Sequence, residues 1–271
     1  MYCIYIQVSR IPDHPPAHSR VPSRMRRNAS RLEGNRARPM ILSSGVFMTV
    51  NISNLTIATP VAVSSTNPVA LELNGAEAIA EFPSVVKVLS DGSVQFTAPT
   101  KGASSKSTHR TRCEWSETQN WTLGSAPDHW NRQAMTLTKV NSAQKVVVSQ
   151  MHVRGDDSPP VKVFWNKGNI TLGFRTSYNQ TTPVNSTLLQ GVPLGTKFDV
   201  IIHATSAGVV KVTARCNGVS RTSSELQLDD SWDTRLFEFH GGIYNQVDYT
   251  DATPADDGSV CIISELSLSH G

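Results

Sequence analysis

Gln150 and His152 lie two positions apart in "KVVVSQMHV", residues 145–153, a run that otherwise has the composition of a β-strand. Side chains of a strand alternate between its two faces, so the pair shares one face, which we also expect to hold Val146 and Val148. An imidazole exchanges protons near neutral pH, and an amide donates a hydrogen bond to a developing anion. The pair therefore predicts either a proton-transfer site or the solvated face of an edge strand.

A second polar face is predicted in "HRTRCEWSE", residues 109–117. The same alternation puts Arg110, Arg112 and Glu114 together and leaves the intervening residues for the opposite face. Three ionisable groups are costly in a dry core unless they are paired and hydrogen-bonded. This segment therefore lines a wet groove or forms a surface ladder of ion pairs.

A third polar face is predicted in "FEFHGGIYNQ", residues 237–246, where His240, Tyr244 and Gln246 share one side. The phenol of Tyr244 is either a proton donor in a groove or a packed aromatic side chain whose hydroxyl meets water. An Arg, an amide, an imidazole and a phenol would supply a cation, a hydrogen-bond donor and two proton-transfer groups.

The elements that must position these residues are strands. Runs rich in Val, Ile, Thr and aromatic residues alternate with turn-forming stretches such as "SDGS" and "NKGN". At least eleven strands and almost no amphipathic helix predict an all-β jelly-roll sandwich of two antiparallel sheets, with a concave substrate groove for an extended polymer. The one helix we expect lies within "NPVALELNGAEAIAEFPSV", residues 67–85.

Charge is distributed unevenly along the 271 residues. Residues 1–47 hold eight arginines against Asp13 and Glu33, a balance of +6, so the net charge of +3 leaves −3 for the rest of the chain. A general nucleic-acid surface is not expected on such a body. The four cysteines have neither zinc-site spacing nor the density of a disulfide scaffold.

The first 47 residues differ in composition from the rest. They are rich in Arg and Pro, lack apolar periodicity and show no secretory signal pattern, so we expect a disordered leader or translated upstream sequence before a later start at Met40 or Met48. Residues 48–271 are predicted to form a single jelly-roll domain. No apolar run approaches the roughly 20 residues that span a bilayer, so no membrane partner is expected.

Taken in order along the chain, the three polar segments resemble motifs of the alginate lyases of polysaccharide lyase family 7. That family has an R-[ST]-E-L-R strand, a Q-[IV]-H strand and a Y-F-K-A-G-[VI]-Y-N-Q strand, which appear here as "RTRCE", "QMH" and "EFHGGIYNQ". The resemblance covers roughly residues 50–271. With Arg110 in the first position, Arg112 and Glu114 exchange the family's acid and base, and His240 replaces its lysine.

The resemblance implies endolytic β-elimination of the 1,4-glycosidic bond between uronic acids, giving 4,5-unsaturated oligosaccharides. Its catalytic residues would be Arg110 and Gln150 on the substrate carboxylate, His152 as base, and Tyr244 as the acid, which would also act as base in syn elimination from mannuronate. A tyrosine titrates near about 10, so that use requires a neighbouring cation. The substrate-binding residues would be Arg112, Glu114, Lys162, His240 and Gln246.

The resemblance further implies an anionic polysaccharide partner, a monomer, a secreted or periplasmic location, and neither cofactor nor metal. Two alternatives stay open: a lyase for another polyuronate such as glucuronan, and a carbohydrate-binding jelly roll without turnover, which would display exposed aromatic platforms. A glycoside hydrolase requires paired carboxylates, often in an E-x-D-x-x-E strand, and the sequence has no such strand.

Overall fold

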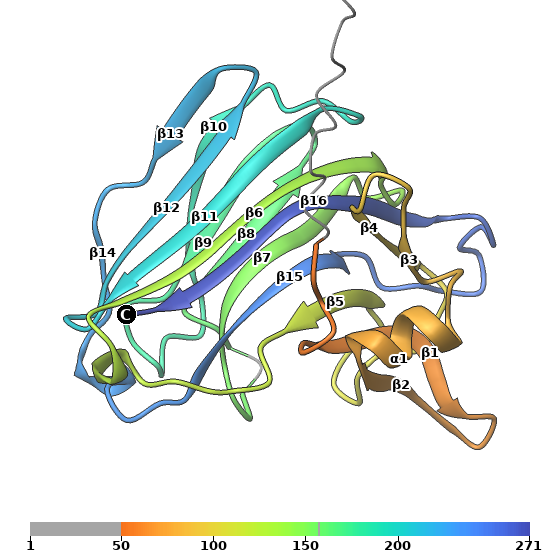
Figure 1. Ribbon diagram of the computed structural model, residues 1–271, viewed down its shortest axis with the longest axis horizontal. Coiled ribbons are helices and arrows are strands. Elements are labelled where there is room, and N and C mark those ends of the chain that lie inside the picture. Colours follow the sequence, from red (N-terminus) through yellow and green to blue (C-terminus); the bar gives the residue numbers. More distant parts are fainter. Residues whose placement is uncertain (1–49, 157) are drawn as a thin grey trace, which may run out of the picture. The chain divides into compact units, whose positions relative to one another are not determined.

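The computed structural model describes residues 50–156 and 158–271, and the predictions for residues 1–47 lie outside this range. Two antiparallel β-sheets pack face to face in the described part (Figure 1). This arrangement confirms the predicted jelly-roll sandwich. None of the helices in the described ranges is long and apolar enough to cross a membrane.

The first sheet carries the three segments with polar faces. Its strand order is β10-β9-β8-β7-β15-β5-β1-β2. The bounds are β1 Thr56–Ser64, β2 Asn67–Asn74, β5 Arg112–Ser116, β7 Lys145–Val153, β8 Val161–Asn166, β9 Asn169–Phe174, β10 Val184–Gln190 and β15 Phe237–Asn245. Strand β15 lies between β7 and β5, so segments about ninety residues or more apart in the chain become neighbours.

The second sheet covers the inner face of the first. Its order is β13-β12-β11-β6-β16-β4-β3, and β14 also pairs with β12. The bounds are β3 Val86–Val88, β4 Val94–Pro99, β6 Asp128–Lys139, β11 Lys197–Thr205, β12 Val209–Cys216, β13 Val219–Thr222, β14 Leu226–Gln227 and β16 Gly258–His270. Short 3-10 turns lie at Leu123–Ser125 and Asp230–Trp232.

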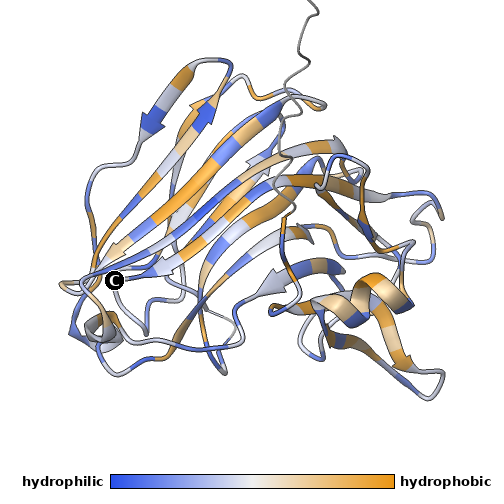
Figure 2. Cartoon of the chain, in the orientation of Figure 1, coloured by the Kyte–Doolittle hydropathy of each residue, from blue (hydrophilic) through white to orange (hydrophobic). Residues whose placement is uncertain are grey.

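The core between the sheets follows from two-residue periodicity. In β11, Phe198, Val200, Ile202 and Ala204 are buried, whereas the residues between them are partly exposed. Figure 2 shows such apolar positions recurring along the strands of both sheets. Each fully buried large apolar side chain contributes about 1.5–3 kcal/mol, so the sandwich can support a polar outer face.

The helix expected within residues 67–85 occupies only part of that stretch. Residues before it form β2, and helix α1 spans Gly75–Glu81. The boundary is set by Asn74, whose side chain accepts a hydrogen bond from the Glu77 backbone while the Glu77 carboxylate accepts one from the Asn74 backbone. The β1–β2 hairpin, which forms one edge of the first sheet, was not predicted from the sequence.

Strand β7 departs from the regular alternation that the sequence suggested. Its pairing with β8 shifts between Val147 and Ser149, and its pairing with β15 shifts over the same stretch. Val147 therefore pairs with Tyr244 on the outer face, while Val146 and Val148 belong to the core. This β-bulge corrects the expectation that Val146 and Val148 share a face with Gln150 and His152.

Candidate active site

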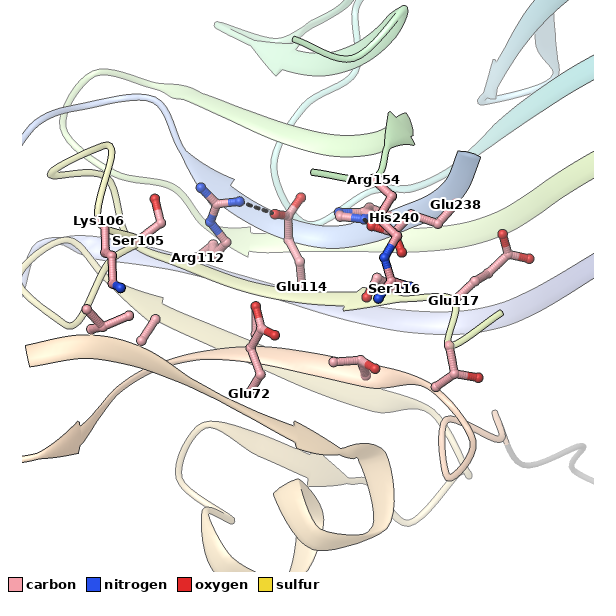
Figure 3. Close-up of a pocket in the computed structure, with 15 residues that line it drawn as sticks. Glu72, Ser105, Lys106, Arg112, Glu114, Ser116, Glu117, Arg154, Glu238 and His240 are labelled. Atoms are coloured by element: carbon pink, nitrogen blue, oxygen red, sulfur yellow. Dashed lines mark hydrogen bonds and ion pairs between the residues drawn. The ribbon is translucent and has the colours of Figure 1, made fainter. Parts of the chain in front are cut away.

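The outer face of the first sheet carries a polar cleft of about 690 Å³ between β1, β2, β5 and β15. Its lining includes Arg112, Glu114 and His240, which are labelled in Figure 3. Gln150, His152 and Tyr244 contact these lining residues from neighbouring positions on the sheet. Among the described residues that line it there is no Trp, Tyr or Phe.

Gln150 is held by a buried carboxylate. Its side-chain Nε2 donates to Glu114 Oε1 at 2.8 Å, and both side chains are almost inaccessible to water. Glu114 Oε2 lies 3.6 Å from Arg112 Nη1, the ion pair drawn in Figure 3. Glu114 therefore orients both an amide and a guanidinium toward the same part of the outer face.

Tyr244 is packed against a cation. The Arg112 guanidinium carbon lies 3.9 Å from the centre of the Tyr244 ring, and the two residues are directly opposed on β5 and β15. Lys162 Nζ lies 6.0 Å from the same ring centre. The cation next to the Tyr244 ring is thus supplied by Arg112.

His152 is stacked on His240 with 4.5 Å between ring centres and 11° between planes. Burial, followed by the positive charges of His240, Lys162 and Arg112, lowers the pKa of His152 well below its usual value. At neutral pH the ring is therefore uncharged and able to accept a proton.

Glu238 lies beside the two imidazoles. Its Oε1 is 3.0 Å from His240 Nε2, and its Oε2 accepts a hydrogen bond from Asn120 Nδ2 at 3.0 Å. Burial acts to raise the pKa of Glu238, but the hydrogen bond and charge of His240, with smaller effects of Asn120 and Arg154, outweigh burial and lower it. Glu238 was not among the predicted site residues, although its position two residues before His240 predicts the same face.

Two predicted site residues, Arg110 and Gln246, make none of the contacts described above. Arg110 precedes β5 and makes a two-point ion pair with Asp248, its Nε and Nη2 each 3.1 Å from a carboxylate oxygen. The Gln246 side chain donates to the backbone oxygens of Tyr244 and Asn245. Both side chains therefore have partners other than the polar side chains described above, and their place in one site with Tyr244 stays a prediction.

The position of β5 also changes how its motif is aligned. When the R-[ST]-E-L-R pattern starts at Arg112, it becomes Arg112-Cys113-Glu114-Trp115-Ser116, with arginine and glutamate in the family order. No exchange of charges is then needed. The remaining departures are Cys113 for serine or threonine, Trp115 for leucine and Ser116 for the second arginine.

Strand pairing supports this alignment. Trp115 lies opposite Gly241, which replaces the alanine of the third motif, so a larger residue on one strand faces a smaller one on the next. Ser116 lies opposite His240, so the two positions where the family motifs have arginine and lysine are also partners. Four of the departures from the family motifs therefore form two cross-strand pairs.

The fold and this set of groups define a polysaccharide lyase: a cation, an amide, an imidazole and a phenol lie on one face of a jelly-roll sandwich. A family model described as alginate lyase matches residues 50–270. The chain therefore belongs to the alginate lyase family, polysaccharide lyase family 7. A search of curated proteins found no match.

Solved structures share the fold at low sequence identity. Alginate lyase PA1167 from Pseudomonas aeruginosa superposes with a TM-score of 0.69 at 22% identity, covering 82% of this chain and 100% of its own. The alginate lyase from Klebsiella pneumoniae gives 0.69 at 19%, with coverages of 82% and 97%. A doubly substituted family 7 alginate lyase A1-II' in complex with the substrate GGMG gives 0.67 at 20%, with 82% and 94%.

Proposed function

We propose that this alginate lyase cleaves its polymer by β-elimination with Arg112, Gln150, His152 and Tyr244 around one uronate unit. The observation that carries the proposal is the convergence of these four groups, which come from β5, β7 and β15, on one sheet face beside a polar cleft. Glu114 and His240 link them, Glu114 through Gln150 and Arg112, and His240 through its stacking on His152.

Elimination begins at an unreactive carbon. The proton on C5 of a uronate is not acidic while the adjoining carboxylate carries its charge, because the carbanion would place negative charge beside negative charge. Arg112 supplies a permanent cation, and the Gln150 amide supplies a hydrogen bond to the same group. Together they stabilise the enolate-like anion as the C5–H bond breaks.

Two groups then move protons. His152 takes the C5 proton, the electron pair of that bond forms the C4–C5 double bond, and the bond from C4 to the bridging oxygen breaks. Tyr244 donates its proton to that oxygen, so the products are a new non-reducing end with the double bond and a new reducing end. The uncharged state of His152 at neutral pH suits it to the role of base.

The relative A1-II' supports these roles. Its product complex carries a tyrosine-to-phenylalanine substitution, and its substrate complex carries that change together with a histidine-to-asparagine substitution. These are the residue types that we assign to proton transfer. Glu114 acts through Gln150 and Arg112 and is a positioning residue.

The remaining expectations belong to the same proposal. The open cleft on an exposed sheet face supports attack within a chain, hence endolytic cleavage. Lys162 lies beside Tyr244 and would contact a further carboxylate of the polymer. We propose a monomer that acts outside the cytoplasm, where its large anionic substrate would be encountered, with residues 48–271 as the lyase domain.

The test is incubation with polymannuronate, polyguluronate and glucuronan separately, following the ultraviolet absorbance of the unsaturated product. We expect absorbance with at least one alginate block and a rapid fall in viscosity, as internal cleavage requires. Absorbance with glucuronan alone would show that the substrate is glucuronan and not alginate. No absorbance with any of the three, from protein with verified folding, would overturn the proposal.

A further inference from the structure

A group of metal-ligating side chains lies beside the proposed catalytic residues. It consists of His152 on β7 and Glu238 and His240 on β15, and their ligand atoms all lie within 4.8 Å of one another. Within the described ranges, no other cluster of His, Cys, Asp and Glu was found with this arrangement. Sequence spacing did not predict it because the donors come from two strands, with Glu238 directly opposite His152.

One donor atom in this group is buried without a partner. His152 Nδ1 is inaccessible to water and makes no hydrogen bond, although it lies 3.9 Å from Glu238 Oε1. The same carboxylate oxygen is 3.0 Å from His240 Nε2. A buried nitrogen lone pair or N–H that faces a carboxylate at this distance loses hydration without gaining a hydrogen bond, which is unfavourable.

A chain of hydrogen bonds also fixes the other oxygen of the Glu238 carboxylate. Glu238 Oε2 accepts from Asn120 Nδ2, and the Asn120 oxygen in turn accepts from Arg154 Nη1. Figure 3 shows Arg154, Glu238 and His240 grouped at one end of the cleft. This support leaves Oε1 directed at the two imidazoles, which is how outer hydrogen bonds orient a carboxylate ligand in metal sites.

We propose that His152 Nδ1, His240 Nε2 and Glu238 Oε1 form a binding site for a divalent transition metal ion, with Zn²⁺ as the best fit. Two imidazoles and one carboxylate are a common zinc donor set. The two rings are stacked with 11° between their planes, so binding requires one ring to turn until both nitrogen lone pairs point at the ion. Tetrahedral bonds of about 2.0–2.1 Å place ligand atoms about 3.3–3.4 Å apart. The distances of 3.0 and 3.9 Å from Glu238 Oε1 lie on either side of that value.

The site depends on a residue that departs from the family motif. His240 stands where the third family motif has lysine, and Ser116 opposite it stands where the realigned first motif has arginine. Two cations at these positions would repel a metal ion, whereas histidine and serine leave an imidazole ligand and a neutral neighbour. Arg112, Lys162 and Arg154 are then the nearby charges that still oppose binding. The substitution pair therefore removes positive charge and adds a donor at the same place.

Occupation of the site has a functional consequence, which rests on the proposed function. A metal ion bonded to His152 would fix the orientation of the imidazole and place positive charge beside it, so the ring would become a poorer base. Zn²⁺ is therefore expected to act as a reversible inhibitor that a chelator removes.

The test is calorimetric titration of ZnCl₂ into chelator-stripped full-length protein at neutral pH, paired with lyase assays. We expect one site per chain, and at least tenfold weaker binding in His240→Gln and in Glu238→Gln. His203→Gln is the matched control, because His203 forms a histidine–carboxylate pair with Asp128 at 2.6 Å on β11 and β6. It should bind zinc as the wild type does.

The outcomes separate the two proposals. Lyase activity without zinc binding, or binding that both Glu238→Gln and His240→Gln leave unchanged, would overturn the metal site and leave the proposed function intact. Zinc binding that depends on these residues, in a protein without lyase activity, would support the site and overturn the function. If one variant fails to fold, as judged by circular dichroism, the other decides, and His240→Lys provides a third measurement in which zinc inhibition should be lost.

Discussion

At the residue scale, side-chain types and two-residue spacing predicted most of the polar side chains that meet in the candidate active site. Gln150, His152, His240 and Tyr244 were predicted from strand alternation and motif resemblance, and the structure brings them together with Arg112 and Glu114. The choice between two arginines could not be made that way. Arg110 and Arg112 have the same parity, and only the start of β5 and the partner Asp248 distinguish them.

This distinction gives a paired prediction. Arg112→Ala should lower kcat/KM for alginate by about 10²–10³, because it removes a cation from the position where charge develops. Arg110→Ala removes a half-exposed ion pair with Asp248 and should change kcat/KM less than about threefold. Steady-state kinetics of the two variants show which arginine contacts the substrate carboxylate. A larger loss of kcat/KM in Arg110→Ala would restore Arg110, the residue assigned from the sequence.

The lowered pKa of His152 predicts the pH dependence of the chemistry. The base is active when unprotonated, and burial with neighbouring positive charge makes protonation harder. Activity should therefore persist below the usual histidine pKa of about 6.5 and fall only as the pH drops through the lowered value. The acid limb of kcat/KM, measured with chelator present, reports this group in the free enzyme. An acid limb above 6.5 would contradict the assignment.

At the element scale, the sequence predicted strands well and irregularities poorly. The long runs that form β7, β11, β15 and β16 have clear composition, but the bulge in β7 leaves no sequence signal because valine fits either face. The β1–β2 hairpin was missed because its Ala, Pro and Asn residues are weak strand formers. Register, and with it the pairing of Trp115 with Gly241, required the structure.

That pairing predicts a coupled effect on stability. A Cβ added at Gly241 would lie 2.5 Å from the Trp115 ring and from Gln133 Oε1, too close for either. Gly241→Ala should therefore lower the free energy of unfolding by about 1–3 kcal/mol, and Trp115→Leu should relieve much of that loss in the double variant.

Urea unfolding of the two single variants and the double variant measures the coupling. Gly124→Ala is the control, because its added Cβ meets nothing within 4 Å. Strictly additive free energies would show that Trp115 and Gly241 are not matched to one another.

At the scale of the whole molecule, the site exists because distant strands become neighbours. Strand β15 enters the first sheet between β7 and β5 and so brings the tyrosine beside both the arginine and the histidine. Composition predicted an all-β sandwich, but it could not predict this order of strands. The resemblance of three motifs to one family implied that the three segments supply one site, but the order of the strands required the structure.

The extent of the lyase domain leads to a prediction at this scale. The family model begins at residue 50, and the described strands begin at Thr56. A fragment of residues 48–271 should therefore have the thermal midpoint and kcat/KM of the full chain, within a few degrees and about twofold. Parallel melting and kinetics of both forms check this. A fragment that melts much lower would place residues 1–47 within the folded unit.

The central claim is that Tyr244 and His152 act in chemistry on one bound uronate. Tyr244→Phe should bind an alginate oligosaccharide within a fewfold of the wild-type Kd while turnover falls by about 10³ or more, because only the proton donor is lost. Tyr178→Phe, which alters a tyrosine bonded to Asp156 away from the cleft, should leave turnover unchanged. A folded Tyr244→Phe variant with near wild-type turnover would contradict the account.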